Sequence, residues 1–196
     1  MTPRASNPWP DTMPTVPEDW RGWLCANTAR ALLERLSPET KWVVECGTWT
    51  GCSARWIVEN GPNTMLICID TWQGSPEHHT NPDWACRLPT LYETCQRNLW
   101  PWRDRIVMLR RDSLVGLCEV FAAGIVPDLI YLDSKHTVGR VAAELAVCAE
   151  LFPTAAIVGD DYNNAAVAKA ADEHAKLMNR TLVNCRDAFA FDRRTA

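Results

Sequence analysis

Two glycines and a small hydroxyl residue follow an apolar run in the segment "VECGTWTGCS", residues 44–53. Glu45 precedes Gly47 and Gly51, which are four residues apart, and Ser53 comes next. A strand that ends in a glycine turn before a helix lets backbone amides approach a small ligand. Tight turns of this kind also need glycine when no ligand binds. The segment therefore predicts a small-molecule binding loop, with a purely structural turn as the alternative.

A nicotinamide dinucleotide is one ligand for such a loop. Its fingerprint requires Gly-x-Gly-x-x-Gly directly after a strand. Residues 47–52 read Gly-Thr-Trp-Thr-Gly-Cys, which lacks that spacing. An aspartate at the end of the second strand, such as Asp70, also occurs in proteins that bind nicotinamide cofactors. The glycine spacing nevertheless argues against a nicotinamide-binding protein.

Acidic residues also stand at the ends of later apolar runs: Asp70, Asp112, Asp133, Asp160 and Asp161. If those runs are parallel strands of one sheet, their carboxyl ends meet at one edge, where open α/β sheets bind ligands. Carboxylates at that edge can accept hydrogen bonds from ligand hydroxyls or coordinate hard cations. The distribution therefore predicts one acidic site.

The elements that would position these residues alternate in type. Five apolar runs are typical of strands buried on both faces: 41–46, 64–70, 105–110, 127–133 and 154–161. Helical patterns lie at 51–60, 88–99, 114–123, 138–152 and 164–178, and another runs from Asp19 to Ser37-Pro38. Residues 181–185 and 188–192 are strands so close together that they must form an antiparallel hairpin. We therefore predict an α/β fold: a doubly wound, Rossmann-like sheet of seven strands, five of them parallel, with a C-terminal antiparallel hairpin.

The composition is that of an ordinary globular protein. A formal net charge of -4 gives no electrostatic reason to expect binding to nucleic acid or to an anionic membrane. No run approaches the ~18 apolar residues of a membrane span, and the N-terminus lacks a signal-peptide pattern. Nine cysteines without a CxxC pair argue against a disulfide framework and favour a reducing cytoplasm.

Prolines crowd residues 1–18 and predict an arm without regular secondary structure, followed by one domain over residues 19–196. Trp9 could pack this arm on the body or on a partner subunit. The chain has ten tryptophans, which could line an aromatic substrate pocket or be buried in the core or in a dimer interface. The arm and the tryptophans together predict a homodimer.

These motifs resemble those of the class I S-adenosylmethionine-dependent methyltransferases, over nearly the whole chain from about residue 20. "VECGTWTG" resembles their first motif, "ICIDTW" the second and "RRDS" the third. "DLIYLDSKH" and "AIVGDDY" are similar to later motifs of the small bacterial branch of macrocin- and novobiocin-type O-methyltransferases. The resemblance implies transfer of the sulfonium methyl group to an oxygen of a small-molecule acceptor.

The resemblance also implies which residues bind S-adenosylmethionine. The methionine portion would lie against the first motif: Glu45, Gly47, Thr48, Trp49, Gly51 and Ser53, with Glu45 nearest the amine. Asp70 would accept the ribose hydroxyls, and Thr71 and Trp72 would border the adenine, Trp72 with its ring face. Asp112 and Ser113 would bind the edge of the base, although Ser113 could instead only cap a helix. Asp133 completes the predicted set.

A divalent metal such as Mg²⁺ is the second implied ligand. Asp133, Asp160 and Asp161 match positions that bind a metal in the resembled branch, where the ion chelates a substrate diol and would lower the pKa of a hydroxyl. Neighbouring residues of a strand point to opposite faces, so Asp160 and Asp161 converge only where the strand has ended. One of them could instead cap the next helix or bond a loop amide.

His136 is the candidate catalytic base. Some relatives carry an acidic base two residues after the first metal aspartate, but Lys135 stands there in this chain. Histidine accepts a proton near neutral pH, although a surface role is the alternative for His136. His78 and His79 lie in residues 73–89, a segment rich in turn formers that predicts a lid or acceptor wall.

Two other functions stay open. The same cofactor site would serve methyl transfer to nitrogen or to a protein side chain, and a cofactor-binding domain without turnover could act as a partner subunit. The sequence does not identify the acceptor, because its specificity depends on the irregular lid and arm.

Overall fold

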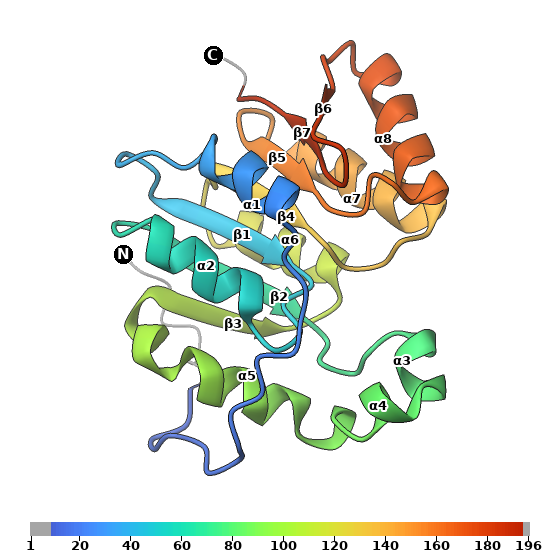
Figure 1. The fold of residues 1–196 in the computed structure, drawn as a ribbon. Coiled ribbons are helices and arrows are strands. Elements are labelled where there is room, and N and C mark those ends of the chain that lie inside the picture. The colour runs from blue at the N-terminus through green and yellow to red at the C-terminus, as the bar shows by residue number, and fades with distance from the viewer. Residues whose placement is uncertain (1–8, 194–196) are drawn as a thin grey trace.

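The computed structural model describes residues 9–193 and has a seven-stranded sheet with helices on both faces (Figure 1). The strands are β1 (Trp42–Cys46), β2 (Met65–Asp70), β3 (Ile106–Arg110), β4 (Leu129–Leu132), β5 (Ala156–Gly159), β6 (Val183–Asn184) and β7 (Phe189–Phe191). Their order in the sheet is β3-β2-β1-β4-β5-β7-β6. β1 to β5 are parallel, and β7 is antiparallel to both β5 and β6. The predicted fold is therefore confirmed, including the C-terminal hairpin.

The helices follow the predicted alternation with the strands. They are α1 (Ala26–Leu33), α2 (Cys52–Asn60), α3 (Pro76–Thr80), α4 (Pro82–Ala85), α5 (Leu91–Leu99), α6 (Ser113–Ala122), α7 (Val138–Leu151) and α8 (Ala165–Leu177), with 3₁₀ helices η1 (Leu88–Thr90) and η2 (Trp100–Arg105). In residues 9–193 we find no helix with the length and apolar character that a bilayer crossing requires.

Successive residues of the strands enter two separate cores. On β1, Val43 packs in the core formed with α1, α2 and α5, whereas Val44 packs in the core formed with α6, α7 and α8. Both side chains are fully buried. Burial on both faces explains why the strands read as continuous apolar runs. The doubly covered sheet is a rigid base for the loops at its edge.

The first helix begins later than the sequence predicted. α1 starts at Ala26, whereas the spacing of the tryptophans indicated a helix from Asp19. The residues before α1 instead cross the edge of the sheet without helical structure. The side chains of Trp49 and Thr50 both donate hydrogen bonds to the backbone oxygen of Arg21. Side chains of the glycine loop thus satisfy backbone groups that a helix would have satisfied internally.

Part of the predicted arm packs on the body of the same chain. Residues 1–8 lie outside the described residues, but Trp9 Nε1 donates to the backbone oxygen of Ile106 at 2.8 Å. Its ring meets Trp100 edge-on, with centroids 6.1 Å apart. Of the two predicted roles for Trp9, the structure has the intramolecular one. The domain boundary after residue 18 stays a prediction.

The connections of the sheet change direction between β1 and β4. β1 has β2 on one side and β4 on the other, so the loops after β1 and β4 leave the sheet in different directions. Figure 1 shows α3 and α4 beyond the edge toward which β1, β2 and β3 point. This is the edge where the predicted acidic residues lie.

Candidate active site

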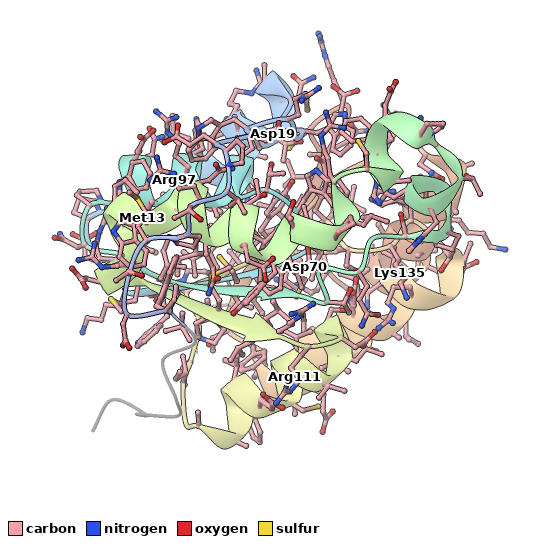
Figure 2. The ribbon with its side chains drawn as sticks, turned by 90° about the horizontal axis from the view of Figure 1, so that it is seen from below. Met13, Asp19, Asp70, Arg97, Arg111 and Lys135 are labelled. Carbon is pink, nitrogen blue, oxygen red and sulfur yellow. The ribbon has the colours of Figure 1, made fainter. Side chains whose placement is uncertain are left out.

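A cavity of about 620 Å³ opens at the carboxyl ends of the strands. The loops after β1 to β5 line it, together with α3 and the segment before α1. Figure 2 labels three of the lining residues, Asp70, Arg111 and Lys135, to the right of Met13 and Arg97. Every predicted site residue lines this cavity except Glu45, Gly51 and Trp72.

The loop between β1 and α2 has left-handed backbone at three residues, namely Gly47 (φ 92°), Trp49 (φ 51°) and Gly51 (φ 91°). A Cβ atom on Gly51 would lie 2.8 Å from Leu99 Cγ. Gly51 is therefore needed for its backbone conformation and for packing on α5, and it is not exposed to the cavity. For Gly51, the alternative of a purely structural turn is therefore sufficient.

Asp70, at the end of β2, holds the glycine loop. Its Oδ2 accepts hydrogen bonds from the backbone amides of Thr48 and Trp49, each at 2.8 Å, and its Oδ1 accepts one from the amide of Trp72 at 2.7 Å. Oδ2 thus has both of its lone pairs occupied, and Oδ1 has one left. Asp70 can therefore position the loop and accept one ligand hydroxyl on Oδ1 at the same time.

Glu45 lies beneath the loop and is fully buried. Its carboxylate accepts hydrogen bonds from Thr48 Oγ1 at 2.8 Å and from Ser53 Oγ at 2.5 Å. Burial raises the pKa of Glu45 to about 7, against the opposing effect of the two hydroxyls. Glu45 therefore supports two residues that line the cavity and does not reach the cavity itself.

Trp72 does not border the cavity, so the predicted contact of its ring face with adenine is wrong. The side chain is 1% exposed, packs edge-on against Tyr92 and donates from Nε1 to the backbone oxygen of Trp49. The backbone at Trp72 is left-handed (φ 50°), and the ring packs in the core. Its neighbour Thr71 does line the cavity.

Asp112 is held by a basic residue that the sequence analysis missed. Arg140 of α7 donates to both carboxylate oxygens of Asp112, and this hydrogen bonding lowers the pKa of Asp112. Asp112 also accepts a bond from the amide of Leu114 and caps α6. Ser113, the next residue, lines the cavity at the start of the helix.

Glu144 is a second missed residue, one turn beyond Arg140 on α7. It is 1% exposed, and its Oε1 accepts hydrogen bonds from the hydroxyls of Ser113 and Ser134. Burial raises the pKa of Glu144, and the serine hydroxyls oppose this. The sequence did contain a signal for this residue. Glu144 stands next to Leu145, on the face of the helical segment 138–152 that the apolar pattern predicted to be buried.

Asp133, His136 and Asp161 form an acid–histidine cluster in the cavity. His136 Nε2 lies 3.0 Å from Asp161 Oδ2 and 3.4 Å from Asp133 Oδ1. The hydrogen bond from His136 to Asp133 raises the pKa of the imidazole, while burial raises the pKa of Asp133 to about 6. One ligand atom from each residue lies within 4.8 Å of the other two.

Asp160 also lines the cavity but is not part of this cluster, so the structure groups Asp133 and Asp161 with His136 and not with Asp160. Its Oδ1 accepts from Thr28 Oγ1 at 2.6 Å, and its Oδ2 lies 3.1 Å from the hydroxyl of Tyr131. β5 ends at Gly159 and Asp161 is left-handed (φ 57°), so the strand alternation no longer applies to Asp160 and Asp161. His136 takes the third place instead.

The predicted lid segment forms the short helices α3 and α4. His78 lines the cavity, and its Nδ1 lies 2.9 Å from Ser75 Oγ. His79 Nε2 lies 2.8 Å from the backbone oxygen of Gln73, outside the cavity lining. This segment thus brings one of its two histidines to the cavity, and its role as a lid stays a prediction.

Comparisons with known proteins identify the class of enzyme. A family model described as a methyltransferase domain matches residues 44–162, which is more than half of the chain. The chain belongs to this methyltransferase family. The match covers the glycine loop, Asp70, Asp112 and the acid–histidine cluster. A search of curated protein sequences gave no match.

Solved structures share the fold of the methyltransferase. Cofactor-bound Rv0187 from MTB is 20% identical, with a TM-score of 0.62 over 89% of this chain and 84% of that one. The O-methyltransferase TomG from Streptomyces achromogenes, in complex with SAM, is 18% identical, with a TM-score of 0.61 over 89% and 82%. An O-methyltransferase from Bacillus cereus, in complex with SAH, is 16% identical, with a TM-score of 0.58 over 87% and 83%. Family and fold agree: the chain contains a methyltransferase domain, with the fold of enzymes whose structures were solved in complex with SAM or SAH.

Proposed function

We propose that the enzyme moves the methyl group of S-adenosylmethionine to an oxygen atom of a small-molecule acceptor. The observation that carries the proposal is the acid–histidine cluster, which shares one cavity with the predicted cofactor residues. The resemblance to macrocin- and novobiocin-type O-methyltransferases supports oxygen as the acceptor atom. The similar folds of two O-methyltransferases are consistent with it.

The chemistry of the cavity suits the cofactor. When bound, S-adenosylmethionine supplies an electrophilic methyl group on a positively charged sulfonium. Asp70 would accept a ribose hydroxyl through the lone pair of Oδ1 that the backbone amides leave free. Asp112, held by Arg140, and Ser113 would bind the edge of the base. The hydroxyls of Thr48 and Ser53, which donate their protons to Glu45, would accept hydrogen bonds from the amine of the methionine portion.

The donor set of the acid–histidine cluster also suits a divalent cation. Asp133 and Asp161 offer the oxygen ligands that Mg²⁺ prefers, and the imidazole of His136 would suit Mn²⁺ as well. A cation held by these residues would lower the pKa of an acceptor hydroxyl. Asp160 would support the site through Tyr131, whose hydroxyl lies 3.0 Å from Asp133 Oδ2.

Without a cation, His136 would accept the proton itself. The acceptor oxygen forms a bond to the methyl carbon while the carbon–sulfur bond breaks, and its electron pair stays on sulfur. The hydroxyl proton would move to Nδ1 of His136, and Asp133 and Asp161, which lie beside Nε2, would stabilise the imidazolium. The walls of the cavity contribute by aligning the acceptor with the methyl group, which is an entropic effect.

Methyl-labelled S-adenosylmethionine and a small-molecule extract test the proposal. We expect label on an oxygen of a small molecule. Label on nitrogen or protein would favour the first alternative, and cofactor binding with no transfer would favour a non-catalytic subunit.

Chelator then separates the two ways of activating the acceptor. If a cation acts, chelator abolishes turnover, Mn²⁺ restores it, and Asp161→Asn lowers Mn²⁺ affinity more than Asp160→Asn. If His136 is the base, chelator has no effect and His136→Ala abolishes turnover.

Partners and compartment complete the proposal. We propose a small-molecule acceptor as the partner, with no nucleic acid and no membrane, and a homodimer in the cytoplasm. The nine cysteines support a reducing compartment, because all are free thiols.

A further inference from the structure

Four aromatic side chains from separate segments meet beside the cavity, and we call them the aromatic wall: Trp23 before α1, Trp49 in the glycine loop, His78 of α3 and Trp84 of α4. The rings of Trp23 and Trp84 have centroids 4.7 Å apart, and those of Trp49 and His78 4.4 Å. All but Trp84 line the cavity, and Trp23 is 53% exposed. Half-exposed indole beside a cavity offers an open ring face to a ligand.

Trp49 is fixed in this wall before any ligand binds. Its backbone is left-handed, a conformation that non-glycine residues rarely adopt and that is enriched at functional sites. Three hydrogen bonds hold it: its amide donates to Asp70, its Nε1 donates to the backbone oxygen of Arg21 at 3.0 Å, and its own oxygen accepts from Trp72. A ligand that stacks on this ring therefore loses little entropy in ordering it.

The wall lies near both ends of the proposed reaction site. Trp49 is bonded directly to Asp70, the proposed ribose ligand. His78 lines the same cavity as Asp70 and His136. An acceptor ring on the wall would therefore share the cavity with the cofactor and with the acid–histidine cluster.

The charges around the cavity restrict what this ring can carry. Seven carboxylates line it: Asp70, Glu77, Asp112, Asp133, Asp160, Asp161 and Asp187. Among residues 9–193 the basic lining residues are Arg111, Lys135 and Arg140. Arg140 pairs with Asp112, and Arg111 pairs with Glu119. An anionic acceptor needs basic partners, and it would meet an excess of negative charge here.

We propose that the aromatic wall binds a flat, uncharged or positively charged ring of the acceptor, and that the cavity excludes acceptors that carry phosphate or carboxylate groups. Flat rings stack on indole, and the faces of tryptophan rings attract cations. The inference rests on the proposed function for the identity of the methyl donor, and it adds the class of acceptor.

Ring probes that differ only in charge test the inference on the full chain. We would titrate naphthalene-2-methanol, 2-naphthylmethylammonium and 2-naphthoate by calorimetry, with cyclohexylmethanol as a probe without a flat ring. The titrations would be made with and without S-adenosylmethionine. We expect the neutral and cationic rings to bind about tenfold tighter than 2-naphthoate, and cyclohexylmethanol to bind least.

Trp23→Ala should weaken binding of the neutral and cationic rings by about tenfold, and Trp23→Phe should retain most of it. Phe121→Ala is the matched control, because Phe121 is also 53% exposed but lies on α6, outside the cavity lining. Equal binding of 2-naphthoate, unchanged binding by Trp23→Ala, or no binding of any ring probe would overturn the inference.

Cofactor affinity, measured separately, distinguishes the two proposals. A chain that binds S-adenosylmethionine but does not discriminate among the probes would retain the proposed function and lose the aromatic-ring acceptor. A chain that binds the ring probes as expected but not S-adenosylmethionine would lose the proposed function alone.

Discussion

A Cβ atom placed on Gly47 would lie 1.9 Å from the backbone oxygen of Asp133. The glycine loop after β1 and the loop that carries the acid–histidine cluster therefore touch through their backbones. The amide of Asp133 also donates to the oxygen of Cys46, which fixes the two loops side by side. The proposed cofactor and acceptor ends of the cavity thus meet at this backbone contact.

Gly47→Ala should lower the free energy of unfolding by more than about 2 kcal/mol, because it adds a backbone clash to the cost of a left-handed alanine. Urea unfolding measures this. Gly139→Ala is the matched control, since a Cβ there meets nothing within 4 Å and Gly139 lies in α7. The control should be as stable as the wild type or slightly more so. Equal stability of both variants would contradict the contact.

Glu45 should make the protein less stable as the pH rises. Its folded pKa is about 7, above its ordinary value of 4.5, so between these values the native state holds a proton that the unfolded state has lost. Stability from this group is therefore present at low pH and lost as the pH rises through about 7. Glu45→Gln removes the titration, so its stability relative to the wild type should rise by about 3 kcal/mol between pH 4 and pH 8.

Urea unfolding at several pH values measures the difference. The side-chain amide that Glu45→Gln introduces keeps an acceptor and a donor for the hydroxyls of Thr48 and Ser53, which can rotate. Glu39→Gln, at an exposed position, serves as the control and should follow the wild type at every pH. A constant difference between wild type and Glu45→Gln would show that Glu45 does not titrate in this window.

The sheet could be predicted because strands buried on both faces consist of consecutive apolar residues, a pattern that is visible in the sequence. Strands covered on both faces are apolar at every position, as in the run that became β4, and the short gap between β6 and β7 leaves an antiparallel hairpin as the only connection. The edge that holds the site followed from the same topology. Acidic residues after parallel strands must lie at one end of the sheet.

Side-chain direction at that edge could not be predicted, because it depends on how each strand ends. Trp72 turns inward and Asp160 turns toward Thr28, although the sequence assigned both to ligands. Arg140 and Glu144 were missed because their partners, Asp112 and Ser113, are distant in sequence and on another element. Local periodicity contains no information about such pairs.

Asp70→Ala should weaken S-adenosylmethionine binding by about ten- to a hundredfold, because charge-assisted hydrogen bonds contribute roughly 1.5–3 kcal/mol. The variant loses the proposed ribose contacts and also the bonds that hold Thr48 and Trp49. Titration calorimetry measures the affinity. Asp104→Ala, at an exposed position on η2, is the control. Unchanged affinity in Asp70→Ala would remove Asp70 from the site.

The predicted homodimer can be checked by sedimentation of the full chain and of a chain that begins at Asp19. We expect a dimer for the full chain and weaker association for the shorter one, because the shorter chain lacks the proline-rich arm and Trp9. Trp9 packs within its own chain, so its removal should also expose the ring of Trp100. A monomer in both cases would refute the dimer.

Glu144 should act as a positioning residue that joins the two ends of the cavity. Its Oε1 accepts from Ser113 beside the proposed adenine site and from Ser134, which follows Asp133. Glu144→Ala removes the acceptor of both hydroxyl protons and should cost about 2 kcal/mol of stability or more.

Glu144→Gln keeps an oxygen at the same place, so it should restore most of the stability and of the cofactor affinity that Glu144→Ala loses. Glu150→Ala, at an exposed position of the same helix, controls for the loss of a carboxylate from α7. Urea unfolding and cofactor calorimetry on the three variants measure both effects. If Glu144→Gln is as damaged as Glu144→Ala, the negative charge matters and not the acceptor oxygen. If Glu144→Ala binds the cofactor as the wild type does, Glu144 stabilises the fold without positioning the site.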